Sequence, residues 1–285
     1  MSRKLPTLLL TPAVGALLIW MLVPLSMTVY FSLVDYNLMD PGPLSFVGLE
    51  NFEFFVTDPD FWPSVMNTLM LIGTVVAVTV VFGILLALLV NDPFPGRGIV
   101  RVLLISPFFV MPTVNALLWK HLMMNPIYGV LANVWRFFGL EPVDWMTHYP
   151  LLAVTIMLIW QWLPFACLIF MTSLQSMDRE QLEAARMDGA NSVQCFFHLT
   201  LPHLARAIAV VIMIEMIFLL GVFAEISTTT AGGPGNESTN LTYLVYKQAL
   251  LNFDVGSASA GALFAVILAN IVTIFMLRVI GKNLD

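Results

Sequence analysis

Six long apolar segments constrain this sequence more than any other feature. They span residues 7–31, 67–89, 101–118, 151–174, 207–223 and 260–279. A helix of about 20 apolar residues crosses the roughly 30 Å hydrocarbon core of a bilayer. Only 11% of the residues are charged, and a water-soluble protein with so few charges would expose large apolar patches. The sequence therefore predicts an all-α, polytopic membrane protein with six transmembrane helices in a single domain, residues 1–285.

Some of these segments carry features that a plain spanning helix would lack. Pro107 and Pro112 lie in the third segment and should kink it, because proline leaves backbone carbonyls unpaired. Glu215 lies in the middle of the fifth. The first segment follows Arg3 and Lys4, as a signal peptide would, but it is longer than the roughly 7–15 residues of a signal-peptide apolar core. We expect it to remain as the first span.

Lysine and arginine are distributed unevenly among the connections. Nine lie at the two ends and in the second and fourth loops: Arg3, Lys4, Arg97, Arg101, Arg179, Arg186, Arg206, Arg278 and Lys282. The other three loops hold only Lys120, Arg136 and Lys247. Cytoplasmic connections carry an excess of basic residues, so both termini are predicted to be cytoplasmic. The first loop, residues 32–66, has acidic but no basic residues and is predicted to be extracytoplasmic, with its Phe and Trp side chains packed: Phe46, Phe52, Phe54, Phe55, Phe61 and Trp62.

The fourth loop, residues 175–206, is the longest segment assigned to the cytoplasm. Asp178 with Gln181 three residues later forms a capping-box pattern, so a helix should begin there. Gly189 should end this helix in a left-handed conformation. Asn191 or Ser192 can cap a second short helix, and Pro202 is expected to break the chain before the fifth span. These signals predict a short helix–turn–helix at the membrane surface; on physical grounds alone it could equally be a solvated connector.

The same loop carries a motif of fixed spacing. It consists of an acidic residue with two alanines, an Asp-Gly-Ala triplet and a Leu-Pro pair, at Glu183, Ala184, Ala185, Asp188, Gly189, Ala190, Leu201 and Pro202. This pattern resembles the "EAA" signature of permeases in binding-protein-dependent ABC importers. One departure is Ala205, where the family often has proline. The resemblance implies that the first helix of the loop is a coupling helix, which binds in a groove of an ATPase subunit.

A second resemblance concerns the stretch after the fifth segment. Residues 230–239 contain Gly232-Gly233-Pro234, and a Tyr-x-x-Ala sequence follows at Tyr246. This arrangement is similar to carbohydrate permeases of the maltose-permease class. A looser similarity, from the first span to the tail, resembles the polyol (sorbitol or mannitol) permeases. Taken alone, the stretch could also be a Gly/Pro-rich turn of any membrane protein.

The resemblance implies a set of partners. They are a pair of ABC ATPase subunits that bind ATP and Mg, a second permease subunit in a heterodimer, and an extracytoplasmic solute-binding protein. The sequence has no G-x-x-x-x-G-K-[ST] loop, so ATP hydrolysis is expected on another chain, and no cofactor, metal site or catalytic residue is expected in this one. The chain should lie among lipids in a bacterial inner membrane, and no nucleic acid is expected to bind it.

Substrate contacts are expected on the fourth and fifth segments. An ionisable residue within a span is by default a functional hypothesis, which singles out Glu215. The maltose-permease resemblance places substrate-lining positions at Gln161, Trp162, Phe165, Glu215 and Phe218. Helical spacing adds Glu225 to the face of Glu215 and Phe218. Each of these residues could instead contact lipid or a neighbouring helix, and Asn115 in the third segment is interpreted as an interhelical hydrogen-bonding residue.

Other functions make different demands on the sequence. The same machinery could carry another solute, such as a phosphodiester or an oligopeptide. A secondary transporter would show paired intramembrane charges or an inverted repeat, and Glu215 has no basic partner in the predicted spans. A membrane enzyme would gather its histidines, whereas His121, His148, His198 and His203 are scattered. Cys167 and Cys195 are interpreted as structural residues.

Overall fold

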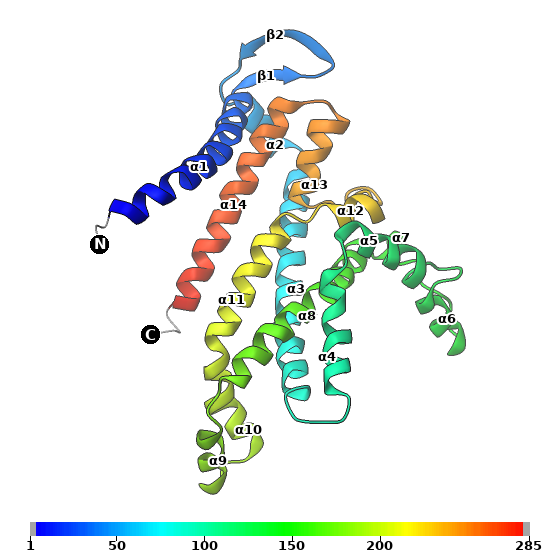
Figure 1. Ribbon diagram of the computed structural model, residues 1–285. Coiled ribbons are helices and arrows are strands. Elements are labelled where there is room, and N and C mark those ends of the chain that lie inside the picture. Colours follow the sequence, from blue (N-terminus) through cyan, green and yellow to red (C-terminus); the bar gives the residue numbers. More distant parts are fainter. Residues whose placement is uncertain (1–3, 282–285) are drawn as a thin grey trace. The chain divides into compact units, whose positions relative to one another are not determined.

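The computed structural model describes residues 4–281, which are mostly helical (Figure 1). Five helices are long and apolar enough to cross a membrane: Leu10–Ser32, Phe61–Leu89, Pro150–Gln175, Ser192–Leu220 and Val255–Ile274. A sixth candidate is a helix pair, Arg97–Phe109 with Pro112–Met123, that is bent by 100°. The prediction of a polytopic helical membrane protein is confirmed, and the number of spans is six if the bent pair counts as one.

The chain forms two compact units. The first comprises the chain up to Trp62 together with Leu244–Leu268, and the second comprises Pro63–Tyr243 together with the residues from Ala269 on. The ends of the chain, residues 1–3 and 282–285, lie outside the described residues, and with them Arg3 and Lys282 of the charge argument.

The first unit begins with α1 (Lys4–Ser32) and a small antiparallel sheet. Strand β1 (Val34–Asn37) pairs with β2 (Asp40–Phe46), so that Val34 lies opposite Phe46. Helix α2 (Glu50–Thr57) follows, and the unit also contains η4 (Lys247–Leu251) and the first part of α14 (Val255–Gly281). The strands were not predicted, because the loop lacks a clear period-2 pattern.

An aromatic cluster forms the core of the first unit. The rings of Phe55 and Phe61 are 5.5 Å apart, and both contact Phe264 of α14. Helix α14 approaches closely because Gly261 has no side chain, and a Cβ there would collide with the ring of Phe55. The expectation that this loop packs is therefore confirmed, through Phe52, Phe55 and Phe61. Three of its aromatic residues remain exposed, namely Phe46, Phe54 and Trp62.

The second unit contains the remaining helices. They are α3 (Phe61–Leu89), α4 (Arg97–Ile105), η1 (Ser106–Phe109), α5 (Pro112–Leu117), η2 (Leu118–Met123), α6 (Val130–Phe137), α7 (Trp145–His148), α8 (Pro150–Gln175), α9 (Arg179–Met187), α10 (Ser192–Cys195), η3 (Phe196–Thr200), α11 (Leu201–Leu220), α12 (Ala224–Thr229) and α13 (Leu241–Tyr246), which ends in the first unit. Helices α3, α8 and α11 share a core that includes Ile84, Phe170 and Val211. Gly83 lets α3 approach α8, since a Cβ there would lie 2.9 Å from that of Ala166.

The third apolar segment is broken rather than kinked. Helix η1 ends at Phe109, and Val110 and Met111 are extended before α5 begins at Pro112. Proline disfavours a helical conformation in the residue before it, which explains the position of the break. The continuous, kinked helix predicted at residues 101–118 is therefore wrong, because the two halves meet at 100°. That the pair forms one span stays a prediction.

The helix of the fifth apolar segment begins well before residue 207. One continuous helix runs over Ser192–Leu220, so the break predicted at Pro202 is wrong. The start of the membrane span at residue 207 lies within this helix and stays a prediction. The turn before Pro202 is a π-helix, in which the amide of Leu201 bonds to the carbonyl of Phe196. A wide turn accommodates the proline, which cannot donate a hydrogen bond of its own. The helix ends at Leu220, not at residue 223.

Candidate functional site

The coupling loop, residues 175–206, joins α8 to α11 and forms the α9–α10 tip of the second unit (Figure 1). Helix α9 begins after Asp178, whose carboxylate accepts a hydrogen bond of 2.9 Å from the amide of Glu180. The predicted start is therefore confirmed. Gln181 was expected to complete a capping box, but the cap that forms is the single bond to Glu180.

Gly189 ends the first helix of the coupling loop, as predicted. Its φ is +88°, in the left-handed region that glycine adopts at no steric cost. The amide of Gly189 bonds to the carbonyl of Arg186, and the amide of Ala190 bonds to that of Ala185 at 3.0 Å. These two bonds satisfy carbonyls that the helix end would leave unpaired, so the turn has a defined direction.

Asn191 starts the second helix of the loop. Its side chain accepts from the amide of Gln194 at 2.9 Å, and the side chain of Gln194 accepts from the amide of Asn191 at 2.8 Å. This is a complete capping box. Of the two caps considered from the sequence, the structure therefore has Asn191 rather than Ser192.

The motif residues of α9 divide between two faces. Ala184, Asp188 and Gly189 are exposed, whereas Ala185 and Ala190 are half-buried. Met187 lies on the exposed side and is 87% accessible, which makes it the largest apolar group there. The sequence analysis missed Met187 because it considered only small residues and rim charges. The available signal was a long apolar side chain three residues after Ala184, near the end of a short helix rich in charged residues.

The inner side of α9 faces a cavity of about 740 Å³. Glu183 and Arg186 line it from the coupling loop, and the turn between α3 and α4 lines it opposite. Arg97 and Arg101 of α4 both donate to the carbonyl of Val90 at 3.0 Å. They neutralise the carbonyl end of α3, so this wall of the cavity is held by hydrogen bonds.

The base of the loop is also tied together. A ring nitrogen of His203 lies 2.9 Å from the carbonyl of Ser173 near the end of α8. Leu201 and Pro202 of the motif form the start of α11 in the same continuous helix. The sequence analysis treated His203 only as a scattered histidine; the structure gives it a role in holding α11 to α8.

Glu215 is fully buried in α11. Its Oε2 accepts a hydrogen bond of 2.6 Å from the hydroxyl of Thr79 on α3, while Oε1 has no partner among the described residues. A buried polar atom without a partner is costly in an apolar environment. Glu215 therefore joins α11 to α3 and keeps one oxygen available for a further hydrogen bond.

Gln161 lies beside the break in the third segment. Its amide nitrogen donates to the carbonyl of Val110 at 2.8 Å, and its oxygen accepts from Asn115 at 2.9 Å. Backbone groups at membrane depth need internal partners, and Gln161 supplies one where the helix is interrupted. The prediction that Asn115 bonds between helices is confirmed, and its partner is Gln161.

The predicted aromatic residues gather in one cluster. Trp162 contacts Phe165 and Phe218, with ring centroids 5.8 and 5.3 Å apart. Phe108 of η1 joins them, stacked on Phe165 at 5.4 Å, and was not predicted. Phe218 is 61% exposed, so this cluster is partly accessible from outside the chain.

Glu225 does not share a helical face with Glu215 and Phe218. The helix ends at Leu220, and Phe223 has a non-helical backbone. Glu225 lies on the separate helix α12, where it is buried. The prediction assumed one continuous helix from Glu215 to Glu225. The non-helical residues between α11 and α12 interrupt that spacing, so the two carboxylates do not share a face.

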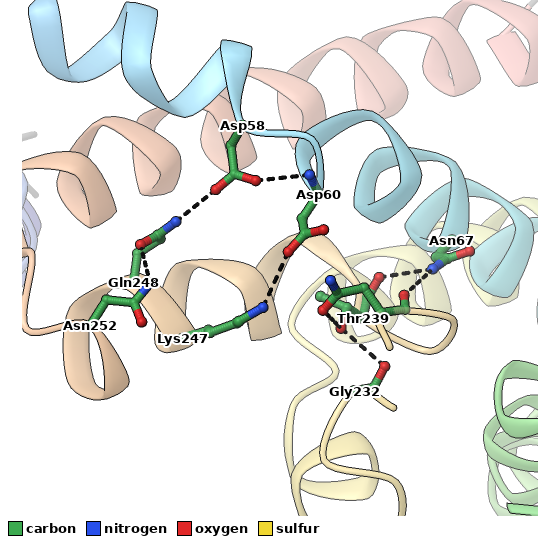
Figure 2. Close-up of polar contacts among 9 residues, drawn as sticks. Asp58, Asp60, Asn67, Gly232, Thr239, Lys247, Gln248 and Asn252 are labelled. Atoms are coloured by element: carbon green, nitrogen blue, oxygen red, sulfur yellow. Dashed lines mark hydrogen bonds and ion pairs between the residues drawn. The ribbon is translucent and has the colours of Figure 1, made fainter. Parts of the chain in front are cut away.

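The Gly-Gly-Pro segment is a rigidly held loop (Figure 2). Thr239 donates to the carbonyl of Gly232 at 3.1 Å, and Asn67 of α3 donates to the carbonyl of Thr239 at 3.0 Å. Asn240 donates to the carbonyl of Val222 just beyond the end of α11. The segment therefore fastens the end of α11 to the start of α3 within the second unit.

The residues after Tyr246 are held in the first unit. Lys247 forms an ion pair with Asp60 at 3.1 Å, and Gln248 donates to Asp58 at 2.8 Å (Figure 2).

Among residues 4–281, His, Cys, Asp and Glu side chains form no group of three that could hold a metal ion. The two cysteines are buried and unpaired.

Residues 79–285 match the family model described as "Binding-protein-dependent transport system inner membrane component". The match contains the broken third segment, the coupling loop and the Gly-Gly-Pro segment. The chain belongs to this family. It is therefore a multi-pass permease subunit of the bacterial inner membrane, and it is non-catalytic because the ATPase of such importers is a separate chain.

Individual relatives support the same assignment. The permease is 36% identical to a probable ABC transporter permease, y4oQ of Sinorhizobium fredii, over 87% of this chain and 81% of the relative. It is 32% identical to the sulfoquinovosyl glycerol permease SmoG of Agrobacterium fabrum, over 98% and 91%. Its identity to the trehalose/maltose permease MalF of Thermococcus litoralis is 30%, over 98% and 94%.

A solved structure shares the fold of this permease. It is a bacterial ABC transporter involved in the import of the acidic polysaccharide alginate, with a TM-score of 0.81 and 23% identity. The likeness covers 98% of this chain and 96% of the other. The ABC permease fold expected from the sequence is thus confirmed.

Proposed function

We propose that this permease is one of two transmembrane subunits of an ATP-driven importer for a carbohydrate. The relatives named for sulfoquinovosyl glycerol and for trehalose and maltose support this cargo. The observation that carries the mechanism is the coupling loop, an exposed short helix that continues through one turn into an unbroken spanning helix. A polyol remains a narrower prediction within the same class.

A second cargo has specific support. The permease is 28% identical to an sn-glycerol-3-phosphate transport permease, UgpA of Pectobacterium atrosepticum, over its whole length. A phosphorylated solute needs cationic or amide partners. Lys120 is the basic residue that we considered for binding a phosphate group. Its ammonium group already donates to the carbonyls of Thr228 and Thr229. We therefore favour a neutral, hydroxyl-rich cargo.

The ATPase is proposed to dock on the exposed side of α9. Met187 offers an apolar anchor there, and Ala184 and Gly189 allow close approach of the backbones. ATP and Mg are bound by the ATPase pair. This arrangement requires the loop at 175–206 and both termini to be cytoplasmic, as the excess of basic residues predicts. In one permease domain of 285 residues, the bent helix pair would be the third of six spans.

The substrate is proposed to contact the aromatic cluster of Trp162, Phe165 and Phe218. Aromatic rings pack against the C–H faces of sugars, and Phe218 is accessible. Gln161, Glu215 and Glu225 are buried in this conformation, so they would reach the substrate only after the surrounding helices move. The second permease subunit, proposed to be a different chain, completes the pathway, and an extracytoplasmic binding protein delivers the cargo.

Replacing Met187 tests the coupling mechanism. We expect Met187→Asp to abolish co-purification of the ATPase and sugar uptake while the permease is still inserted, because a carboxylate cannot enter an apolar groove without large cost. Met187→Leu is the matched control and should retain both activities. Full ATPase association by the Asp variant would contradict the proposed docking surface.

Replacing Phe218 tests the substrate site. Phe218→Ala should lower uptake of the radiolabelled sugar while ATPase co-purification is unchanged, because a sugar-contacting ring is lost. Ile217 is equally exposed, at 62% against 61%, and points in another direction on the helix. Ile217→Ala should therefore transport normally, and equal losses in the two variants would argue against a specific contact by Phe218.

A further inference from the structure

Helix α6 (Val130–Phe137) has three distinct faces. Leu131, Ala132 and Trp135 are buried or half-buried and face the rest of the unit. Asn133 and Arg136 form a polar face. At about 100° per residue, the third face contains Val130, Val134 and Phe137, which are 51%, 49% and 84% exposed. An apolar stripe along an exposed helix requires a partner.

The contacts of α6 fix its depth relative to α8. Leu131 packs against a buried cluster that contains Met124 and Ala153, and Ala153 belongs to the first turn of α8, a membrane-crossing helix. Only residues 124–129 separate α6 from η2, and even fully extended they would reach roughly 20 Å. The helix is therefore held at the level at which α8 enters the membrane.

Hydrogen bonds fix the orientation of α6 as well. The side chain of Asn125 accepts from the amides of Ile127 and Tyr128, and Arg136 donates to the carbonyl of Pro126 at 3.1 Å. Gly129 lies so close to Asn125 that a Cβ there would be 2.5 Å from its carbonyl oxygen. Hydrogen bonds thus point the apolar stripe in one direction. The ring of Phe137 contacts that of the adjacent Phe138 at 5.4 Å, but Phe138 is itself 70% exposed, so this contact leaves the stripe uncovered.

Aromatic residues with a polar end surround this helix. Tyr128, Trp135, Trp145 and Tyr149 all fall between the end of η2 and the start of α8. Trp and Tyr are enriched where membrane and water meet, because their rings prefer the apolar side and their polar atoms the headgroups. A helix with a strong apolar stripe and a polar face lies flat in that layer.

We propose that α6 lies in the membrane–water interface beside the start of α8, with Val130, Val134 and Phe137 inserted among the lipid acyl chains. Asn133 and Arg136 then face the headgroups and water. The buried face of α6 packs against Met124, which follows the broken third segment, so that segment is held at the same depth. The partner of the apolar stripe is the lipid of one leaflet, which also covers the exposed sides of the spanning helices.

Spin labels on single cysteines test this placement in the assembled transporter, reconstituted into liposomes. The background carries Cys167→Ala and Cys195→Ala and must retain uptake. Labels follow at positions 130, 131, 133, 134, 136 and 137, one at a time. Collision with molecular oxygen reports lipid, and collision with a nickel chelate reports water. Ile19→Cys on α1, where Ile19 is 67% exposed, gives the lipid reference.

We expect the oxygen-to-nickel ratio to be several-fold higher at 130, 134 and 137 than at 133 and 136, and both collisions to be low at 131. A fluorophore at 137 should also be quenched by brominated lipids more strongly than one at 133. Nickel access at 137 equal to that at 133 would overturn the proposal. Shielding of the stripe from both reagents would also overturn it and would place the second permease subunit there.

Discussion

Gly189 shows how one backbone angle sets the direction of the coupling loop. Its φ of +88° is costly for other residues by about 1–2 kcal/mol, and more for a β-branched one. A Cβ at this position meets nothing within 4 Å, so a substitution acts within the chain through backbone strain alone. Asparagine tolerates the left-handed region better than other side chains.

We therefore expect Gly189→Val to lower ATPase co-purification and uptake several-fold, with Gly189→Asn closer to the unsubstituted protein. Both variants add a side chain to the docking surface. A difference between them in ATPase co-purification therefore reports the backbone strain at residue 189 alone. If the two variants lose association equally, contact with the ATPase, rather than the backbone angle, is what glycine provides.

Asp254 gives the first unit a dependence on pH. Its carboxylate accepts from the amide of Ser257 at 2.9 Å at the start of α14. Burial, together with the nearby charge of Asp35, raises the pKa of Asp254 above its ordinary value. A carboxyl whose pKa is higher in the folded state contributes stability that is present below the unfolded pKa, about 3.9, and lost as the pH rises through the folded pKa.

Asp254→Asn should therefore raise the melting temperature of the detergent-purified protein at about pH 8, and have little effect near pH 4. Asparagine retains the helix cap and removes the charge. Thermal unfolding of both proteins at the two pH values measures the difference. A lower melting temperature for the Asn variant at the higher pH would contradict the assignment.

At the scale of elements, the broken third segment depends on a side chain from another helix. Gln161 donates to the carbonyl of Val110, which lies in the interruption between η1 and α5. Gln161→Met would leave that carbonyl and Asn115 without this partner. The loss of stability should be about 1–3 kcal/mol. Met157→Leu, one turn away and equally buried, is a volume-conserving control that should cost less.

Thermal unfolding of the two variants in detergent compares them directly, and uptake measured in parallel tests the proposed substrate role of Gln161. A Gln161→Met protein as stable as the Met157→Leu control would show that the break is held by packing alone. Lower uptake without lower stability would move Gln161 from a structural to a substrate-binding role.

Local chemistry explains which elements could be predicted. The start of α9 at Asp178 and its end at Gly189 depend on neighbouring residues only, so the sequence was sufficient. The helix through Pro202 was predicted wrongly because a wider π-turn at Phe196 relieves the proline. The carbonyl of Val110 in the bend is bonded by Gln161, fifty-one positions away, and no local pattern contains that information.

The candidate site shows the same division. Family membership follows from the spacing of Glu183, Asp188 and Pro202, a property of the sequence alone. Met187 was missed because its importance depends on exposure, which the sequence does not state. Glu225 was placed on the wrong face because helical spacing was extended across residues 221–223, where the helix has ended.

At the scale of the whole molecule, the distribution of basic residues predicts which regions face the cytoplasm. Single cysteines at two exposed sites can test it: Met187→Cys in the coupling loop, and Phe46→Cys in β2, where Phe46 is 76% accessible. A membrane-impermeant maleimide should label Met187→Cys only in inside-out vesicles, and Phe46→Cys only in right-side-out vesicles. The native cysteines are buried and should react slowly.

Labelling of both cysteines from one side would contradict the assigned topology, because an odd number of spans must separate the two residues. Labelling in the reverse vesicles would invert it. Labelling of Met187→Cys only in right-side-out vesicles would also place the coupling loop out of reach of a cytoplasmic ATPase. The uptake and co-purification experiments would then fail for a reason unrelated to Met187 itself.

The unbroken helix over Ser192–Leu220 has a consequence for how ATP turnover is coupled to transport. At about 1.5 Å per residue it is roughly 43 Å long, and it runs without a break from Ser192 past the level of Glu215. If the ATPase moves the coupling loop, as proposed, the displacement is carried along this helix to its far end at Leu220. ATP turnover without movement of cargo would then require either release of the ATPase from α9 or bending of the turn at Gly189, which joins α9 to the long helix.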